Sequence, residues 1–218
     1  MNPSSTSSHP SPTVLPPRPH HTRQPWNGTG AVGEPDLERA ATGARILLEA
    51  LGIDVHSEAM MRTPERMAAS LLEMTSPRPF HLTTFPNDGN YDELILAKSI
   101  PLRSLCEHHM LPFVGTAHIG YLPGERILGL SKLARVLEHF ASRPQVQERL
   151  TVQIADWLSA QLSAAGVGVV IEAEHLCMTL RRVQAPGTTT ITSSLLGVMR
   201  EDPRTRAEFL ALTRVPRY

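Results

Sequence analysis

The sequence predicts an α+β fold in which a mainly antiparallel sheet packs against helices on one face. Helical and strand patterns do not alternate regularly along the chain, so the repeating units of a parallel sheet are not expected. The strongest strand pattern covers residues 167–183, and clear amphipathic helices precede it. At 218 residues, the chain is long enough for one domain with a sizeable core and a tail.

The tail is expected to be residues 1–34, with the folded domain over residues 35–218. Pro, Ser, His and Thr dominate the first segment without periodicity. Such a composition buries too little apolar surface to offset its ordering entropy, which predicts disorder. A transit peptide is the alternative, although the prolines would break its amphipathic helix.

Charge and hydropathy favour small-molecule chemistry over nucleic-acid or membrane binding. The formal net charge is zero and the basic residues are dispersed, so there is no electrostatic footprint for a polyanion. The apolar runs are shorter than the ~20 residues that cross a bilayer, and the N-terminus has no signal-peptide pattern. We therefore expect a cytoplasmic protein, in which the two cysteines are thiols or metal ligands.

Two helices are predicted at the start of the folded domain. Apolar residues recur at helical spacing over residues 37–51, and Gly52 lies where a C-terminal cap is expected. In the stretch RTPERMAASLLEM, Thr63 is expected to be the N-cap and Pro64 to occupy the first helical position. A Pro-, Asn- and Gly-rich segment ends the helical pattern, and residues 91–100 then predict a strand.

The middle of the domain predicts a second strand and two more helices. Residues 114–122 alternate as a strand, and PGER follows as a turn. Ser131 is expected to cap a helix, and a longer amphipathic helix covers residues 144–162, with Gln147 and Glu148 facing away from its core side. The apolar stripe of the first of these helices consists of Leu133, Val136, Leu137 and Phe140.

The C-terminal part of the chain predicts one more strand and one more helix. A Thr-rich strand, residues 188–196, follows a Pro-Gly turn. Asp202 and Pro203 then cap a last helix that runs through Leu212.

The stretch SLCEHHMLPFVG, residues 104–115, contains a candidate metal site. Cys106 and His109 are at positions i and i+3, so a thiolate and an imidazole can converge from one turn. Cys177 could supply a third ligand, and three protein ligands with one open position are typical of catalytic zinc. One C-x-x-H is a weak signal by itself, and buried inert thiols are the alternative.

The strand predicted over residues 167–183 strengthens the metal interpretation. Side chains two apart share one face of a strand. If pairing continues through this segment, His175, Cys177, Thr179 and Arg181 share a face and form one polar wall. A solvent-exposed polar face is the alternative, but such a face does not usually include a lone cysteine between histidine and arginine.

Several long motifs in register resemble the GTP cyclohydrolase I family, and together they cover roughly residues 36–214. They are CEHH, GLSKLARV, RPQVQERLT, EHLCM followed by Arg181, and REDPRTRAEFL. The resemblance implies the tunnelling fold, in which the sheets of neighbouring subunits join into a barrel. It also implies a homodecamer of two pentameric rings with active sites built from neighbouring subunits.

The resemblance also assigns roles to individual residues. It implies a zinc ion held by Cys106, His109 and Cys177, with His108 and His175 as the catalytic histidines. Glu148, with Gln147, would recognise the guanine edge. The positions associated with the triphosphate are Ser131, Lys132, Arg135 and Arg181, joined by Arg66.

The implied reaction is zinc-dependent hydrolysis of the guanine imidazole ring of GTP. Zinc would activate the water that opens the ring at C8, a second hydrolysis would release formate, and rearrangement would give 7,8-dihydroneopterin triphosphate, in the first step of tetrahydrofolate and pterin biosynthesis. Two alternatives remain. One is a tunnelling-fold nitrile reductase that acts on a deazaguanine with a cysteine nucleophile and a nicotinamide cofactor. The other is a non-catalytic or altered-specificity paralogue that binds a guanine nucleotide.

Overall fold

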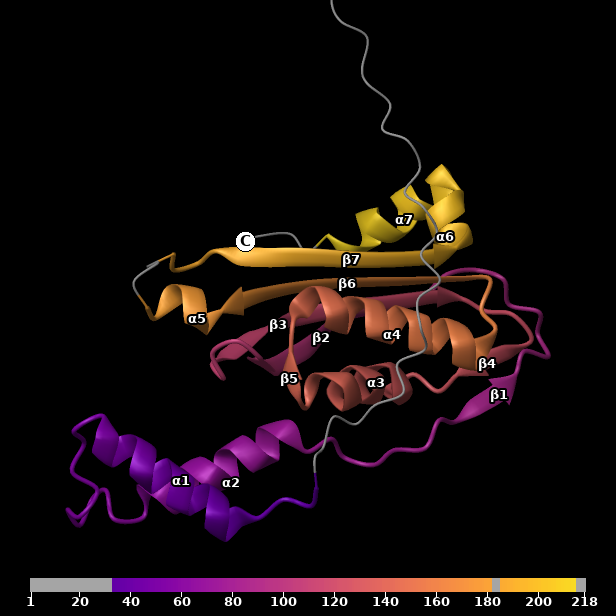
Figure 1. The fold of residues 1–218 in the computed structure, drawn as a ribbon. Helices are drawn as coiled ribbons and strands as arrows, with labels where there is room; N and C mark the ends of the chain where they lie inside the picture. The colour runs from indigo at the N-terminus through magenta and orange to yellow at the C-terminus, as the bar shows by residue number, and fades with distance from the viewer. Residues whose placement is uncertain (1–32, 182–184, 215–218) are drawn as a thin grey trace, which may run out of the picture. The chain divides into compact units, whose positions relative to one another are not determined.

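The computed structural model describes residues 33–181 and 185–214 (Figure 1). The tail predicted for residues 1–34 therefore lies almost entirely outside the described residues. None of the helices within the described ranges is long and apolar enough to cross a membrane.

A five-stranded sheet forms the centre of the domain, with strand order β5-β2-β3-β6-β7. Every pairing in it is antiparallel except the short parallel pairing of β5 with β2. This topology confirms the α+β prediction with mainly antiparallel pairing. The strands are β2 (Ile95–Cys106), β3 (Pro112–Leu122), β5 (Pro144–Gln145), β6 (Gly166–His175) and β7 (Thr189–Gly197).

Two helices, α3 (Ser131–Ala141) and α4 (Gln147–Leu162), cover one face of this sheet (Figure 1). The predicted apolar stripe of α3 is buried, as are Leu150, Ile154 and Leu158 of α4. These side chains pack in one cluster with inward-facing strand residues such as Ile119 and Val169. Removal of this apolar surface from water is the main stabilisation of the domain.

The opposite face of the sheet is covered at one end by α6 (Val198–Glu201) and α7 (Pro203–Thr213). Phe209 of α7 is fully buried against Gly168 of β6, where an added Cβ would lie 2.7 Å from the Phe209 ring. Only glycine admits the aromatic ring at this distance. Asp202 caps α7 as predicted, since its carboxylate accepts a hydrogen bond from the backbone N–H of Thr205 at 2.7 Å.

The two helices predicted at the start of the domain are present as α1 (Leu37–Ala50) and α2 (Thr63–Thr75), which pack against each other. Gly52 adopts φ +76°, as the predicted C-terminal cap requires. A small sheet of β1 (Thr84–Pro86) and β4 (Arg126–Leu128) was not predicted, because three-residue strands are too short to show a period.

Both predicted hydroxyl N-caps are wrong by one residue. Thr63 and Ser131 are the first residues of their helices, and neither helix has a side-chain cap. A preceding turn supplies the missing acceptors. Thr63 donates its N–H to the carbonyl of Met60, and Lys132 donates to that of Gly129.

The strand predicted over residues 167–183 is wrong beyond His175. The chain instead forms the short helix α5 (Leu176–Thr179), so Cys177, Thr179 and Arg181 do not share a strand face with His175. Pairing with both neighbouring strands ends at this point. The last pair with β3 is His175 with Phe113, and the last pair with β7 is Glu174 with Thr189. Without a neighbouring strand, the backbone turns and satisfies its hydrogen bonds locally.

Candidate metal centre

The first two candidate metal ligands come from the turn that joins β2 to β3. Cys106 ends β2, and its carbonyl accepts hydrogen bonds from the N–H groups of His109 and Met110. Met110 has φ +53°, a left-handed conformation that tightens the turn. As a result, His109 folds back over Cys106, with 3.8 Å between Cys106 Sγ and His109 Nδ1.

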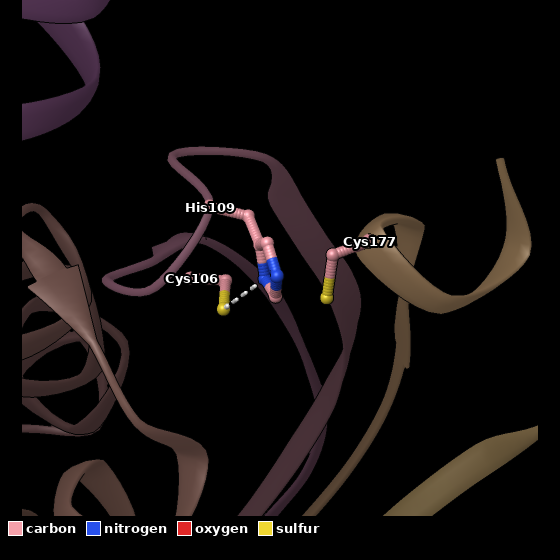
Figure 2. Close-up of side chains that lie close together, drawn as sticks. All are labelled: Cys106, His109 and Cys177. Carbon is pink, nitrogen blue, oxygen red and sulfur yellow. Dashed lines mark hydrogen bonds between the residues drawn. The ribbon is translucent and has the colours of Figure 1, made fainter. Parts of the chain in front are cut away.

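The third ligand, Cys177, comes from α5, which follows the adjacent end of the sheet. The ligand atoms of Cys106, His109 and Cys177 all lie within 4.8 Å of one another. Figure 2 shows the two sulfur atoms on either side of the imidazole ring. The sequence prediction that these three residues come together is confirmed, although Cys177 is placed by a helical turn and not by a strand face.

The donor set fits zinc. Zinc bonds of ~2.3 Å to sulfur and ~2.0 Å to nitrogen with tetrahedral angles imply ligand atoms about 3.5 to 3.8 Å apart. The 3.8 Å between Cys106 and His109 already meets this requirement, and Cys177 needs only a small approach. Two thiols and one imidazole leave one tetrahedral position for water or substrate.

The electrostatics of the thiols also favour a bound cation. Burial, and then the neighbouring Cys106, raise the pKa of the Cys177 thiol, whereas Arg181 acts in the opposite direction. Two thiolates this close would repel each other without a cation. A divalent cation between the two sulfur atoms offsets this repulsion and favours the deprotonated thiols, which are the forms that bind metal.

An ion pair ties the metal-binding turn to α4. Glu107, between the ligand Cys106 and His108, pairs with Arg149, which lowers the pKa of the Glu107 carboxyl group. Arg149 also donates from Nε to Gln145 Oε1 at 3.0 Å, and the backbone N–H of Glu107 donates to the Gln145 carbonyl at 3.1 Å. Arg149 is absent from the residues predicted from sequence, because only the fold brings it to Glu107.

We expect Arg149→Met to weaken zinc binding without abolishing it. The substitution keeps the aliphatic part of the side chain but releases Glu107, so the metal-binding turn is less well ordered before zinc binds. Loss of an outer partner typically lowers metal affinity about 10-fold or more. Competition with a chelator measures the change. Arg45→Met is the matched control, because it removes the exposed Arg45–Glu65 pair. Equal zinc affinities in the two variants would contradict this role.

The two predicted catalytic histidines lie beside the metal ligands in different environments. His108 has a side chain that is 65% exposed, with Nδ1 3.8 Å from Cys106 Sγ. His175 is half-buried and stacks on Phe113, with ring centroids 4.7 Å apart and an interplanar angle of 10°. Burial lowers the pKa of His175, whereas Glu148 acts in the opposite direction. The neutral imidazole of His175 is therefore favoured near pH 7.

Gln147 and Glu148, in the first turn of α4, were both predicted to face away from the core, and only Glu148 does so. Glu148 is exposed, as predicted. Gln147 is only 1% exposed, so the prediction that it faces away from the core is wrong. Its side chain reaches between β6 and β7, where the backbone oxygens of Ile171 and Thr190 accept its hydrogen bonds.

The predicted phosphate-binding residues are spread over three segments. Arg181 follows α5 and is close enough to Cys177 to influence the pKa of its thiol. In the described part of the chain, no hydrogen bond or ion pair joins the others to the metal ligands. These others are Ser131, Lys132 and Arg135 on α3, and Arg66 on α2; all are exposed except Lys132, which is half-buried.

The fold and the site define a class: an α+β protein with a Cys-His-Cys group that could hold a metal ion. Residues 40–214 match the family model for GTP cyclohydrolase I. The chain therefore belongs to the GTP cyclohydrolase I family, whose members are enzymes.

Individual relatives agree with this assignment. "GTP cyclohydrolase 1" of Aquifex aeolicus (strain VF5) is 50% identical over 82% of this chain and 97% of the relative. The protein of the same name from Synechococcus sp. (strain JA-3-3Ab) is 49% identical over 84% of this chain and 82% of the relative. The protein from Homo sapiens is 44% identical over 93% of this chain and 86% of the relative.

A solved structure, the apo form of the archaeosine synthase QueF-Like, aligns with a TM-score of 0.38 and 16% identity. The alignment covers 48% of this chain and 93% of that chain. This likeness is too weak to add to the assignment.

Proposed function

We propose that this protein is a zinc-dependent GTP cyclohydrolase I, with residues 35–218 as its catalytic domain. In this proposal, it hydrolyses the guanine imidazole ring of GTP, releases formate and forms 7,8-dihydroneopterin triphosphate. The observation that carries the proposal is the convergence of Cys106, His109 and Cys177 from two distant segments, with His175 two residues before Cys177 in the chain. The relatives named GTP cyclohydrolase 1 support the choice of substrate.

Cys106, His109 and Cys177 would hold the zinc ion. Bound zinc supplies Lewis acidity, which makes water a better nucleophile near neutral pH. The surrounding protein contributes rigid placement: Cys106 belongs to the buried core cluster, and Cys177 packs against that cluster.

His175 and His108 would move the protons. Ring opening requires a proton for the departing ring nitrogen, and later steps require proton removal from carbon and oxygen. Stacking on Phe113 holds the plane of the His175 imidazole, so its ring nitrogens are presented in a fixed orientation. The exposed His108 lies next to Cys106 and can exchange protons with solvent.

Glu148 would bind the guanine edge, since an exposed carboxylate can accept hydrogen bonds from the ring N–H and the exocyclic amine. Arg181, Arg135, Lys132, Ser131 and Arg66 would bind the triphosphate, for which guanidinium groups are well suited.

We infer that neighbouring copies of the chain complete the site. The proposed phosphate residues on α2 and α3 have no described contact with the metal ligands of their own chain. The outer side of β7 has no partner strand within the described sheet, and pairing with another copy would protect this edge. These features support the homodecamer of two pentameric rings expected from the family.

The proposal predicts that zinc-loaded protein converts GTP to formate and a pterin in equal amounts. Both products should stop on treatment with a chelator and return when zinc is added. Formate assay and pterin absorbance, followed in parallel on protein of known metal content, measure this. Zinc-loaded, assembled protein that binds GTP but yields neither product would instead support a binding scaffold. Formate without pterin would mean that ring opening survives and rearrangement has failed.

A further inference from the structure

The side chain of Gln147 is fully occupied inside the protein. Its Nε2 lies 3.1 Å from the carbonyl oxygen of Ile171, 2.9 Å from that of Thr190 and 3.1 Å from Thr192 Oγ1. Its Oε1 lies 2.8 Å from His175 Nε2. Since the residue is 1% exposed, these partners replace water completely.

These contacts determine which way the amide points. Backbone carbonyl oxygens only accept hydrogen bonds, so the atom that faces Ile171 and Thr190 must be the NH₂ group. A flipped amide would place its oxygen against two carbonyl oxygens and leave buried groups unsatisfied. Gln147 Oε1 therefore faces His175, and His175 Nε2 must carry the hydrogen of that bond.

Thr151 and Thr192 determine the same orientation of the Gln147 amide by a separate argument. Thr151 Oγ1 donates to the backbone carbonyl of Gln147 at 2.7 Å, so it accepts from Thr192 Oγ1 at 2.6 Å. Thr192 Oγ1 therefore faces Gln147 Nε2 with a lone pair, and the two hydrogens of Nε2 are shared among this oxygen and the carbonyl oxygens of Ile171 and Thr190. Each hydroxyl donates one hydrogen bond and accepts another, and the network joins α4 and β7 to His175 at the end of β6.

We propose that Gln147 is a positioning residue for His175. It holds the imidazole with Nε2–H as a fixed donor, so the orientation of the ring and the position of Nδ1 are set by Gln147. Phe113 fixes the plane of the ring, and Gln147 fixes its rotation within that plane. The catalytic use of this orientation rests on the proposed function. The orientation of the ring rests on the hydrogen bonds alone.

This role differs from guanine recognition, which the family resemblance suggests for Gln147. The side-chain donors and the acceptor of Gln147 already have partners within the protein. Exposed Glu148, the next residue of α4, is free to serve the guanine edge instead. The two adjacent residues would then have different roles: Gln147 orients His175, and Glu148 binds the substrate.

The test compares Gln147→Met with Thr192→Val in the zinc-loaded enzyme. Methionine fills the same space without an acceptor for His175, and we expect kcat to fall about 100-fold with KM, zinc content and the GTP dissociation constant unchanged. Thr192→Val removes a member of the same network but leaves Gln147 its two carbonyl partners, so kcat should stay near wild type.

Other outcomes overturn the proposal. A higher GTP dissociation constant in Gln147→Met, repeated in a His175→Ala background, would mean that Gln147 touches the substrate. Equal loss of kcat in Gln147→Met and Thr192→Val would mean that the network is only structural. If the wild type does not turn over GTP, the proposed function fails, and the crystal structure of Gln147→Met then decides: a reoriented His175 ring supports positioning, and an unchanged ring contradicts it.

Discussion

Cys106→Ala is expected to abolish zinc binding and GTP turnover together. Within the described residues, Cys106 is one of three that could hold the ion, together with His109 and Cys177, and it also belongs to the buried core cluster. The two remaining ligands would bind zinc too weakly to retain it during purification. Loss of a Lewis acid that supplies several kcal/mol of transition-state stabilisation lowers turnover about 10³-fold or more. Metal analysis of the purified variant and formate release measure the two losses.

Two comparisons separate metal loss from misfolding in this experiment. Cys177→Ala removes the ligand from the other segment and should give the same double loss. Chelator-treated wild-type protein contains every side chain but no metal, so its circular dichroism and assembly state are the reference for the cysteine variants. A Cys106→Ala protein that retains stoichiometric zinc and normal turnover would show that the metal site lies elsewhere.

Local periodicity is enough to predict the longer helices of the domain, α1, α2, α3, α4 and α7, but not the four-residue helices α5 and α6. The apolar stripe of α3 was identified from spacing alone, and its residues are buried against the sheet. The side of a helix that faces the core depends on residues three and four apart, which the sequence displays directly. The same holds for the capping of α7 by Asp202, since cap and helix are adjacent in sequence.

The end of β6 could not be predicted in the same way. Whether a strand continues depends on the presence of neighbouring strands, and here the neighbours run out at Phe113 and Thr189. The sequence pattern continues to alternate past His175, but the backbone has no strand to pair with. Cys177 nevertheless reaches the metal centre, because α5 turns it towards Cys106.

The contacts of Gln147 and Arg149 illustrate a second limit of sequence reasoning. Both residues are polar and occur in the first turn of an amphipathic helix, where exposure is the usual outcome. Gln147 is buried by partners on β6 and β7, and Arg149 is held by Glu107. These partners are more than 20 residues away in sequence, so no local pattern reveals them.

His175→Ala is expected to keep zinc and GTP binding but to lose turnover. His175 is outside the three-ligand group, so its removal leaves the metal centre intact. Removal of a general acid–base catalyst lowers the rate about 10²- to 10⁴-fold. The variant also leaves Gln147 Oε1 without its partner, which costs roughly 1–3 kcal/mol of stability. Zinc content, the GTP dissociation constant, and formate and pterin production distinguish these effects.

His56→Ala is the matched control, since it removes a histidine that is 79% exposed and distant in sequence from the metal ligands. It should match the wild type in every measurement. Wild-type turnover by His175→Ala would contradict a catalytic role for His175, and loss of zinc with turnover would make His175 part of the metal centre. Retained zinc with lost turnover would separate two functions within one segment: Cys177 binds the metal, and His175, two residues earlier, handles the proton.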